Sequence, residues 1–360
     1  MGCASSSVVE SEPTSWGPCC CHERLEQTYV AHGRGIIVST VQSPLHGIGK
    51  MPPDQTLEEH LDTVECLALC ESRSFLFSGA SDGNIRKWHC KTNAAVASLE
   101  GHASAVLCLV VLDDVLFSGS RDRTVRRWSV LHNTVLSNVE VSGAVRSLIT
   151  SEQRVFSADG EHLRRWTIAN GELFATGTCR GNVNCLGVWK GLLVGGCQDN
   201  TLVISNAFDC QHEKLLEGHR AAVTCVVAMG GYKWGYYEGI IFSASGDGDI
   251  RKWDVKSGAC LAVLSGHKSA ITCLACSSMA SSIFSGSSDG EVKRWDLHDG
   301  HVCRSTKQHH CISPIKSLLA CDRRGVLLSQ SEDGRSRRWD MGPEHCSEDR
   351  GAKFESPNAI

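Results

Sequence analysis

The sequence contains no apolar stretch near the roughly 18 residues that a membrane-spanning helix needs, so we expect no helix that crosses a bilayer. Its first residues, MGCASSSVVE, lack the basic segment and apolar core of a secretory signal peptide. Neither charge sign dominates, because 36 Lys and Arg residues stand against 40 Asp and Glu residues and give a formal net charge of −4. This balance gives no indication of a nucleic-acid-binding protein. Apolar residues at helical spacing are also nearly absent, and the composition is that of an ordinary soluble globular protein.

A short segment that ends in Trp returns along most of the chain. Its copies, which we number in chain order as repeats 1, 2, 3, 5, 6 and 7, read LFSGASDGNIRKW to Trp88, LFSGSRDRTVRRW to Trp128, VFSADGEHLRRW to Trp166, IFSASGDGDIRKW to Trp253, IFSGSSDGEVKRW to Trp295 and LLSQSEDGRSRRW to Trp339. Repeat 4, LVGGCQDNTLVIS, has Ser205 in place of Trp. The steps between these end positions are 40, 38, 39, 48, 42 and 44 residues. This period is typical of a four-stranded propeller blade, and seven such units fit one closed ring.

The 20 cysteines do not indicate a disulfide scaffold, because the sequence carries no secretory signal. Five of them recur at one position of the repeat, where repeats 3 and 7 have Ser147 and Ser317; these cysteines are Cys66, Cys108, Cys185, Cys225 and Cys273. A small, weakly polar residue at a fixed strand position indicates tight packing near the ring axis rather than metal or redox chemistry. We expect reduced thiols and no metal site.

The recurring polar residues resemble those of the WD-repeat family over most of the chain. In that family a His before the first strand, a Ser on the second, an Asp in the following turn and the Trp on the third form a hydrogen-bonded chain. The complete set is His60, Ser78, Asp82 and Trp88; His102, Ser118, Asp122 and Trp128; His219, Ser243, Asp247 and Trp253; His267, Ser285, Asp289 and Trp295. Repeat 7 has Ser329, Asp333 and Trp339, with His309 or His310 as the first member. We assign these residues a structural role, because a catalytic triad would occur once in a unique pocket and not in every blade.

The resemblance predicts an all-β fold, a seven-bladed WD-repeat β-propeller over residues 54–340. Repeats 3 and 4 are degenerate: repeat 3 lacks the His and has a shorter turn, and repeat 4 has Gly195 and Ser205 in place of Ser and Trp. These two blades are expected to be the least stable sector or to carry a specialised surface. We predict that an N-terminal strand at Thr56-Leu57 pairs with the last repeat and closes the ring. The alternative closing strand is residues 352–354 of the C-terminal tail, 341–360.

Residues 1–53 are predicted to be a flexible, lipidated leader. The start Met1-Gly2-Cys3-Ala4-Ser5-Ser6 satisfies the pattern for myristoylation of Gly2. A single myristoyl chain binds membranes only marginally, so a second signal is needed, and Cys3 is a palmitoylation candidate with Cys19, Cys20 and Cys21 as further acceptors. The chance occurrence of a Met-Gly start is the alternative.

Two groups of residues are candidates for protein contacts. The first lies in turns at one end of the blades and comprises Arg121, Arg123, Arg180, Asn182, Asn200, Arg220 and Lys268. The second is the insertion MGGYKWGYYEG of repeat 5, with Tyr232, Trp234, Tyr236 and Tyr237, which has the composition of an interaction hot spot. These aromatic residues could instead fold back over their own blade.

The sequence predicts a non-catalytic scaffold that binds other proteins and is held at the cytosolic face of a membrane by its acyl chains. It predicts no cofactor, no small-molecule substrate and a monomeric propeller within larger complexes. The alternative is a soluble adaptor, for example in substrate recognition by a ubiquitin ligase or in a cytoskeletal complex. An enzyme that uses the central channel would need a cluster of ionisable groups at the axis, which the strand pattern of Cys, Ser and Leu does not provide.

Overall fold

The computed structural model describes residues 27–32, 35–40, 55–58, 60–90, 92, 94–151, 153–168, 170–229, 239–277, 282–296, 302–306, 313–321, 326–332 and 336–340. Within these ranges every regular element is a β-strand except a single 3-10 turn, η1 (Glu71–Arg73). The chain is therefore all-β, as predicted. In this described part no helix is long and apolar enough to cross a bilayer.

The strands form eight antiparallel sheets that follow one another along the chain. The N-terminal sheet consists of β1 (Gln27–His32), β2 (Gly35–Thr40) and β3 (Gln55–Glu58). Repeat 1 forms β4 (Val64–Cys70), β5 (Phe75–Ala80), β6 (Ile85–His89) and β7 (Ala95–Leu99); repeat 2 forms β8 (Val106–Leu112), β9 (Val115–Ser120), β10 (Thr124–Ser129) and β11 (Val135–Glu140). Repeat 3 forms β12 (Val145–Ser151), β13 (Arg154–Asp159), β14 (His162–Trp166) and β15 (Leu173–Thr178); repeat 4 forms β16 (Val183–Trp189), β17 (Leu192–Cys197), β18 (Leu202–Asn206) and β19 (His212–Leu216). Repeat 5 forms β20 (Val223–Met229), β21 (Ile240–Ser245), β22 (Asp249–Asp254) and β23 (Cys260–Ser265); repeat 6 forms β24 (Ile271–Ser277), β25 (Ser282–Ser287), β26 (Val292–Asp296) and β27 (Val302–Thr306); repeat 7 forms β28 (Ile315–Cys321), β29 (Val326–Ser331) and β30 (Ser336–Asp340).

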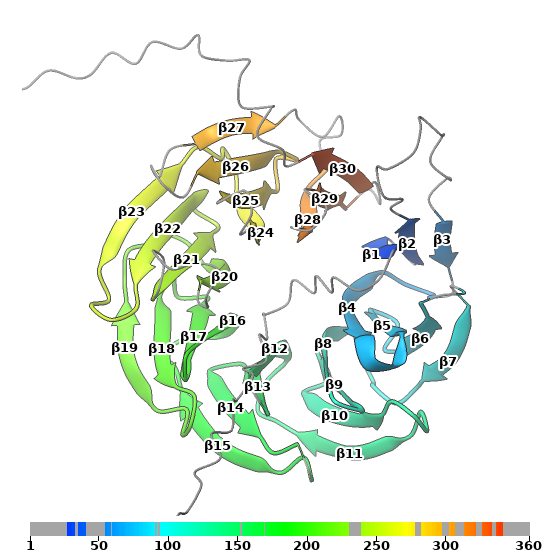
Figure 1. Cartoon of the computed structure of the whole chain (residues 1–360). Coiled ribbons are helices and arrows are strands. Elements are labelled where there is room, and N and C mark those ends of the chain that lie inside the picture. The colour runs from blue at the N-terminus through cyan, green and yellow to red at the C-terminus, as the bar shows by residue number, and fades with distance from the viewer. Residues whose placement is uncertain are drawn as a thin grey trace, which may run out of the picture.

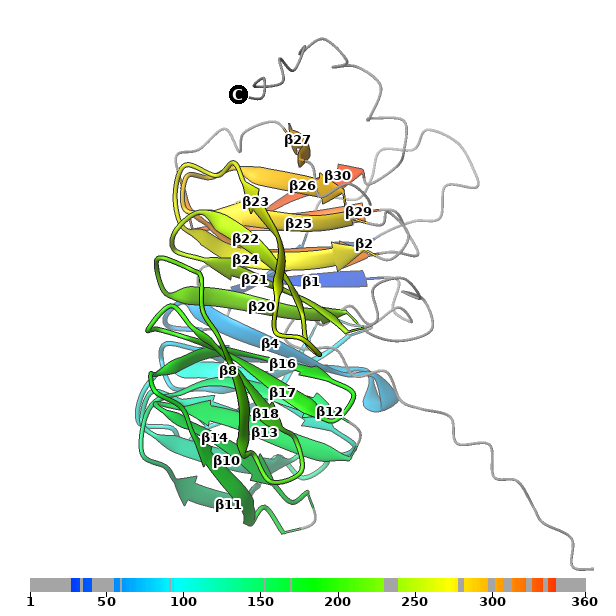
Figure 2. The same cartoon turned by 90° about the vertical axis from the view of Figure 1, so that its left-hand side faces the viewer.

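The sheets are arranged radially around a common centre, and the first strand of each repeat is innermost (Figure 1). Viewed from the edge, the strands run across the thickness of the disc (Figure 2). Each repeat thus forms one blade of a propeller-like structure. The loops at the two ends of the strands therefore lie on two opposite faces of the disc.

The hydrophobic core lies between neighbouring sheets. In one cluster Phe77 and Ile85 of repeat 1 pack with Leu116 and Trp128 of repeat 2. The second strand of most repeats is buried on both faces, as expected for a strand that lies between two sheets. Burial of each Trp ring removes about 150 to 250 Å² of surface from water, which makes these rings the largest single contributions to the core.

The recurring cysteine packs directly against the neighbouring sheet. Cys108 Sγ lies 3.5 Å from the carbonyl oxygen of Val145 in the next sheet. A Cβ atom on Gly119 would stand 2.4 Å from Val145 Cγ1 and 2.7 Å from Cys108 Sγ, so the Ser-Gly-Ser of the second strand leaves room for this contact. Burial raises the pKa of the Cys108 thiol well above its ordinary value. The thiol is therefore protonated and serves packing.

The basic residue directly before Trp ties one sheet to the next. Lys87 Nζ donates to the carbonyl oxygen of Val130 at 2.6 Å. The corresponding Arg127 and Arg165 donate to the carbonyl oxygens of Ile168 and Phe208, also one repeat further on. These contacts neutralise no partner charge, but they satisfy turn carbonyls at the outer rim.

The predicted closure by strand exchange is wrong. Thr56 and Leu57 of β3 pair with Ile37 and Ile36 of β2, and repeat 7 has three strands among its described residues. The reason is that residues 27–40, which the sequence assigned to a flexible leader, form a β-hairpin that gives β3 its own antiparallel partner. The seven repeats form seven sheets as predicted, and the chain has an eighth sheet, β1–β3, that the sequence did not predict. The alternative closing strand at 352–354 lies outside the described residues.

Candidate functional site

Repeat 2 shows the hydrogen-bonded chain that organises one end of the blades. Trp128 Nε1 donates to Ser118 Oγ at 2.8 Å, and Ser118 Oγ lies 2.7 Å from His102 Nε2. His102 Nδ1 lies 2.8 Å from Asp122 Oδ2, which also accepts the backbone N–H of Ala103 at 2.9 Å. A carboxylate only accepts, so Nδ1 carries the proton and Nε2 accepts from the serine hydroxyl.

The same hydrogen-bonded chain recurs in repeats 1 and 5, and repeat 6 keeps its Trp–Ser–His part. The His Nε2 to Ser Oγ distances are 2.7 Å for His60, 2.8 Å for His219 and 2.6 Å for His267. The Trp Nε1 to Ser Oγ distances are 2.9, 2.8 and 2.7 Å for Trp88, Trp253 and Trp295. In repeat 7, Ser329 is buried on β29 and Trp339 lies on β30, whereas Asp333, His309 and His310 lie outside the described residues.

Burial and hydrogen bonding fix the protonation states of these groups. Burial lowers the pKa of His102, and its hydrogen bond to Asp122 offsets this only in part. Burial alone would raise the pKa of Asp122, but hydrogen bonds from Thr124, the Ala103 N–H and His102 outweigh it and lower the pKa to about 2. Each pair is therefore a neutral imidazole beside a carboxylate at neutral pH.

The serine hydroxyls of these networks are not accessible as catalytic nucleophiles. Ser118 is 0 % exposed, accepts from Trp128 and donates to His102, so no substrate reaches its oxygen. The same holds for Ser78, Ser243 and Ser285, each 0 % exposed in its own repeat. A nucleophile needs access and a pocket that occurs once, and neither condition is met at these positions.

Repeats 3 and 4 lack the hydrogen-bonded chain of repeat 2, and each has different contacts in its place. In repeat 3, Arg164 Nε donates to Asp159 Oδ1 at 2.7 Å and its Nη2 donates to Ser142 Oγ at 2.8 Å. Trp166 Nε1 still donates to Ser157 Oγ at 2.8 Å. In repeat 4, Asp199 accepts only from Thr201, and Ser205 is buried where the Trp ring would be.

The face that carries the His-bearing connections and the Asp-bearing turns is called the loop face here. The sequence-predicted contact residues all lie on it: Arg121, Arg123, Arg180, Asn182, Arg220 and Lys268 are exposed, and Asn200 is half-buried. They come from the β9–β10, β15–β16, β17–β18, β19–β20 and β23–β24 connections, so they surround the ring rather than form one cluster. The backbone N–H groups of Arg220 and Lys268 donate to Asp247 and Asp289, which holds these two residues at the rim of their blades.

Sequence reasoning missed a ring of bulges on the same face. In every repeat the ladder between the first and second strands shifts register beside the recurring Cys or Ser, as at Val145/Ser147. A bulge leaves its extra residue unpaired and redirects the side chain. Arg146 and Lys316 are exposed there, whereas Thr224 donates to the carbonyl oxygen of Ile271 at 2.6 Å. In the sequence, these bulge residues can be recognised as the residues directly before the recurring Cys or Ser.

The loop face carries exposed charges of both signs. Besides the basic residues it exposes Glu100, Glu161, Asp199 and Glu217. Nucleic-acid-binding surfaces are strongly positive, so a mixed face favours a protein partner.

A second exposed feature lies on the outer rim between repeats 3 and 4. Phe174 on β15 and Phe208 in the β18–β19 turn are 50 % and 59 % exposed, with ring centroids 5.7 Å apart in an edge-to-face arrangement. The Arg165 guanidinium lies 4.0 Å from the Phe174 ring centroid and 5.1 Å from that of Phe208. The degenerate sector thus carries a specialised aromatic surface.

Two groups of predicted site residues lie outside the described residues. They are the aromatic insertion with Tyr232, Trp234, Tyr236 and Tyr237, and the acylation candidates Gly2, Cys3, Cys19, Cys20 and Cys21.

Comparison with known proteins agrees with this geometry. Residues 51–89, 93–129, 208–254 and 258–296 match the family model "WD domain, G-beta repeat". These segments contain repeats 1, 2, 5 and 6, which are the four with the complete His-Ser-Asp-Trp set. The computationally designed Ika8 protein has a similar solved structure, with a TM-score of 0.74 and 25 % identity over 91 % of this chain and 97 % of that one.

Several curated proteins are similar over part of the chain. Zinc finger CCCH domain-containing protein 62 of Arabidopsis thaliana is 28 % identical over 209 residues, which cover 58 % of this chain and 40 % of that protein. Protein Notchless of Drosophila melanogaster is 32 % identical over 104 residues, 28 % of this chain and 20 % of that protein. Cell division control protein 4 of Saccharomyces cerevisiae is 28 % identical over 92 residues, 26 % of this chain and 11 % of that protein. The chain thus spans 40 % or less of the length of these relatives.

Proposed function

We propose, from the premise that this chain is a WD40-repeat protein, that it is a non-catalytic scaffold which binds other proteins through its loop face. The observation that carries the proposal is that the loop face has two kinds of polar side chain, one buried and one exposed. The His, Ser and Asp side chains that catalysis would require are buried and hydrogen-bonded to one another, whereas exposed side chains of both charge signs surround them. Mixed charges on a rigid scaffold give complementarity to a protein partner.

Charge reversal on the loop face tests this function. The variant Arg121→Glu with Arg220→Glu changes two exposed side chains without touching the buried hydrogen bonds. Its matched control, Lys190→Glu with Lys256→Glu, changes two exposed lysines in turns at the other end of the blades. Proximity labelling in cells should lose a subset of partners with the first variant only. Identical partner sets for both variants and the unaltered chain would contradict the proposal that the loop face binds partners.

We also propose that acyl chains on Gly2 and Cys3 hold the scaffold at the cytosolic face of a membrane. The support is the Met1-Gly2-Cys3 start with Ser6, together with the thiols of Cys19, Cys20 and Cys21 as further acceptors. A myristoyl chain alone gives a binding constant of about 10⁴ M⁻¹, so membrane residence requires the thioester as well.

Labelling and fractionation test the membrane proposal. Clickable myristate and palmitate should label the unaltered chain, and Gly2→Ala should lose both labels. Cys3→Ser combined with Ser at positions 19, 20 and 21 should keep myristate, lose palmitate and move the protein to the soluble fraction. A native protein that is wholly soluble and unlabelled would instead make the soluble adaptor the better description.

We further infer that the N-terminal sheet completes the ring as an eighth blade. The support is that β1 contacts β4 on one side and β29 on the other. Closure would then rest on the packing of a whole sheet and not on a strand shared with repeat 7. Deletion of residues 27–40 should raise amide hydrogen exchange in β4 and β29 while β16, four sheets away, keeps its protection. Unchanged exchange in β4 and β29 would contradict this inference.

A further inference from the structure

Repeat 6 departs from its counterparts at the link between His and Asp. The Nδ1 to Oδ2 distance is 2.8 Å in repeat 2 and 2.9 Å in repeat 5, but it is 3.8 Å between His267 and Asp289. The Asp289 side chain is also more exposed, at 19 %. The turn of repeat 6 has therefore moved away from its histidine, and the hydrogen bond that closes the chain in the other repeats is absent.

The opened link leaves His267 Nδ1 without a partner in a buried position. The His267 side chain is 0 % exposed, and Nδ1 has no hydrogen-bond partner among the described residues. An unsatisfied buried polar atom is energetically unfavourable. In repeat 2 the space beside the histidine is filled by Thr124, whose Oγ1 lies 3.0 Å from His102 Nδ1. Repeat 6 has Glu291 at this position.

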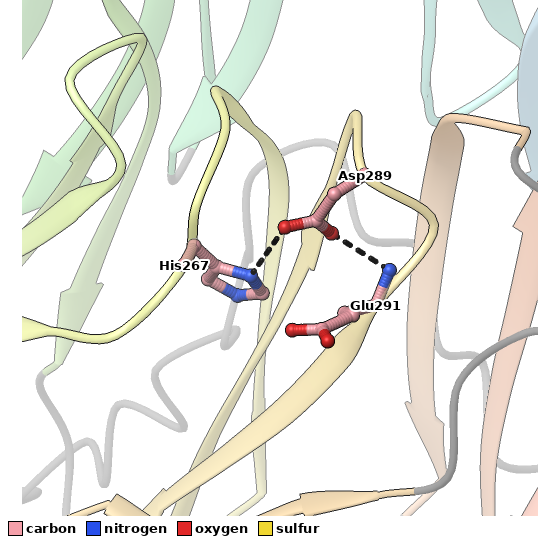
Figure 3. Close-up of side chains that lie close together, drawn as sticks. All are labelled: His267, Asp289 and Glu291. Atoms are coloured by element: carbon pink, nitrogen blue, oxygen red, sulfur yellow. Dashed lines mark hydrogen bonds and ion pairs between the residues drawn. The ribbon is translucent and has the colours of Figure 1, made fainter.

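Glu291 brings a second carboxylate to the same point. One donor atom each from His267, Asp289 and Glu291 lie within 4.8 Å of one another, and the three side chains converge between the His-bearing connection and the turn (Figure 3). Ligands about 2.1 Å from a tetrahedral ion stand about 3.4 Å apart. The 3.8 Å gap between His267 and Asp289 is too long for a hydrogen bond and close to this spacing.

We propose that His267 Nδ1, Asp289 Oδ2 and a carboxylate oxygen of Glu291 bind a divalent transition metal of the zinc type. Imidazole with two carboxylates is a donor set that suits such an ion, with water at the remaining position. The proposal departs from the sequence-based expectation of no metal site, because Glu291 looks like one more polar turn residue until the fold sets it beside His267.

The surroundings of the three ligands are those of a metal site. The backbone N–H of Glu291 donates to Asp289 Oδ1 at 2.8 Å, whereas Oδ2 receives a longer contact of 3.4 Å from the Lys268 backbone N–H. Lys293 Nζ lies 3.0 Å from Glu291 Oε2, a buried atom that has no hydrogen-bond partner among the described residues. His267 Nε2 lies 2.6 Å from Ser285 Oγ, which accepts the Trp295 N–H as well. With Nδ1 bound to metal, Nε2 carries the proton and donates to Ser285, which orients the ring.

Metal titration of the purified, reduced full-length chain tests the proposal. Co²⁺ is used as the probe because its visible spectrum separates nitrogen and oxygen ligands from thiolates, which the 20 cysteines also provide. Glu291→Thr introduces the residue that repeat 2 has at this position. It should lower the affinity for one equivalent of Co²⁺ by at least about tenfold. The matched control, Asp249→Thr, alters the same position of repeat 5, where the His219–Asp247 link is closed, and should bind like the unaltered chain.

The difference spectrum between the unaltered chain and Glu291→Thr should show the bands of a nitrogen and oxygen site, and Zn²⁺ should abolish it. Equal binding by both chains, or a difference dominated by thiolate-to-cobalt charge transfer, overturns the proposal. Glu291→Gln, which keeps the side-chain shape and removes the anionic donor, must give the same loss as Glu291→Thr if the ligand assignment is right.

Discussion

Ser118→Ala is the sharpest test of the idea that the polar chain is structural. The substitution removes one oxygen that accepts from Trp128 Nε1 and donates to His102 Nε2. It changes neither the apolar contacts of the Trp ring nor any exposed group, because Ser118 is fully buried. The variant therefore leaves two buried polar atoms without partners in a single repeat.

The expected cost follows from those two atoms. Each buried group left unsatisfied costs roughly 1 to 3 kcal/mol, so the free energy of unfolding should fall by about 2 to 6 kcal/mol. An unfolding entropy of about 2.1 cal/mol/K per residue gives about 0.75 kcal/mol per degree for a chain of this length. We expect the thermal midpoint to fall by about 3 to 8 °C.

Thermal unfolding followed by circular dichroism measures this shift, and amide hydrogen exchange localises it to β9 and β10. The matched control is Ser137→Ala in the same repeat, since the Ser137 hydroxyl is buried and has no hydrogen-bond partner among the described residues. The control should stay within about 0.5 kcal/mol of the unaltered chain. A Ser118→Ala midpoint no lower than that of the control would refute the structural role.

Four further outcomes follow from the geometry. Gly119→Ala places a Cβ against the next sheet and should cost about 1 to 3 kcal/mol in thermal unfolding. The thermal midpoint should fall as the pH drops below 6.5, because burial lowers the pKa of the imidazoles of His60, His102 and His219 and only the unfolded chain then gains their protons; a midpoint constant between pH 7 and pH 5 contradicts this. Arg164→Met leaves the buried carboxylate of Asp159 without its ion-pair partner and should lower the free energy of unfolding by about 3 to 5 kcal/mol; Arg126→Met, at the same position of repeat 2, should lower it less. Phe208→Ser should leave the thermal midpoint nearly unchanged and reduce proximity labelling of any partner that uses the outer rim.

The repeats were predictable because their periodic residues are the ones that meet in space. A Trp, a Ser, a His and an Asp at fixed offsets form one buried network, as in repeat 2, so each copy in the sequence corresponds to a sheet in the structure. The N-terminal sheet was not predictable in the same way, since residues 27–40 carry none of these markers. Its strands are defined by pairing with each other and with β3, and pairing between distant segments leaves no periodic trace.

The two repeats that break the pattern show why a missing residue does not by itself mean a weak blade. Repeat 3 lacks the histidine, and Asp159 is 0 % exposed, so its carboxylate needs another donor. Arg164 supplies one at 2.7 Å, although it belongs to a pair of basic residues that also precedes the Trp of repeats 1, 2, 5, 6 and 7. Repeat 6 has the complete set of residues, yet its His267 Nδ1 is the one left without a partner. Local chemistry is thus decided by which side chains the turn geometry brings within bonding distance, and the presence of the motif residues alone does not decide it.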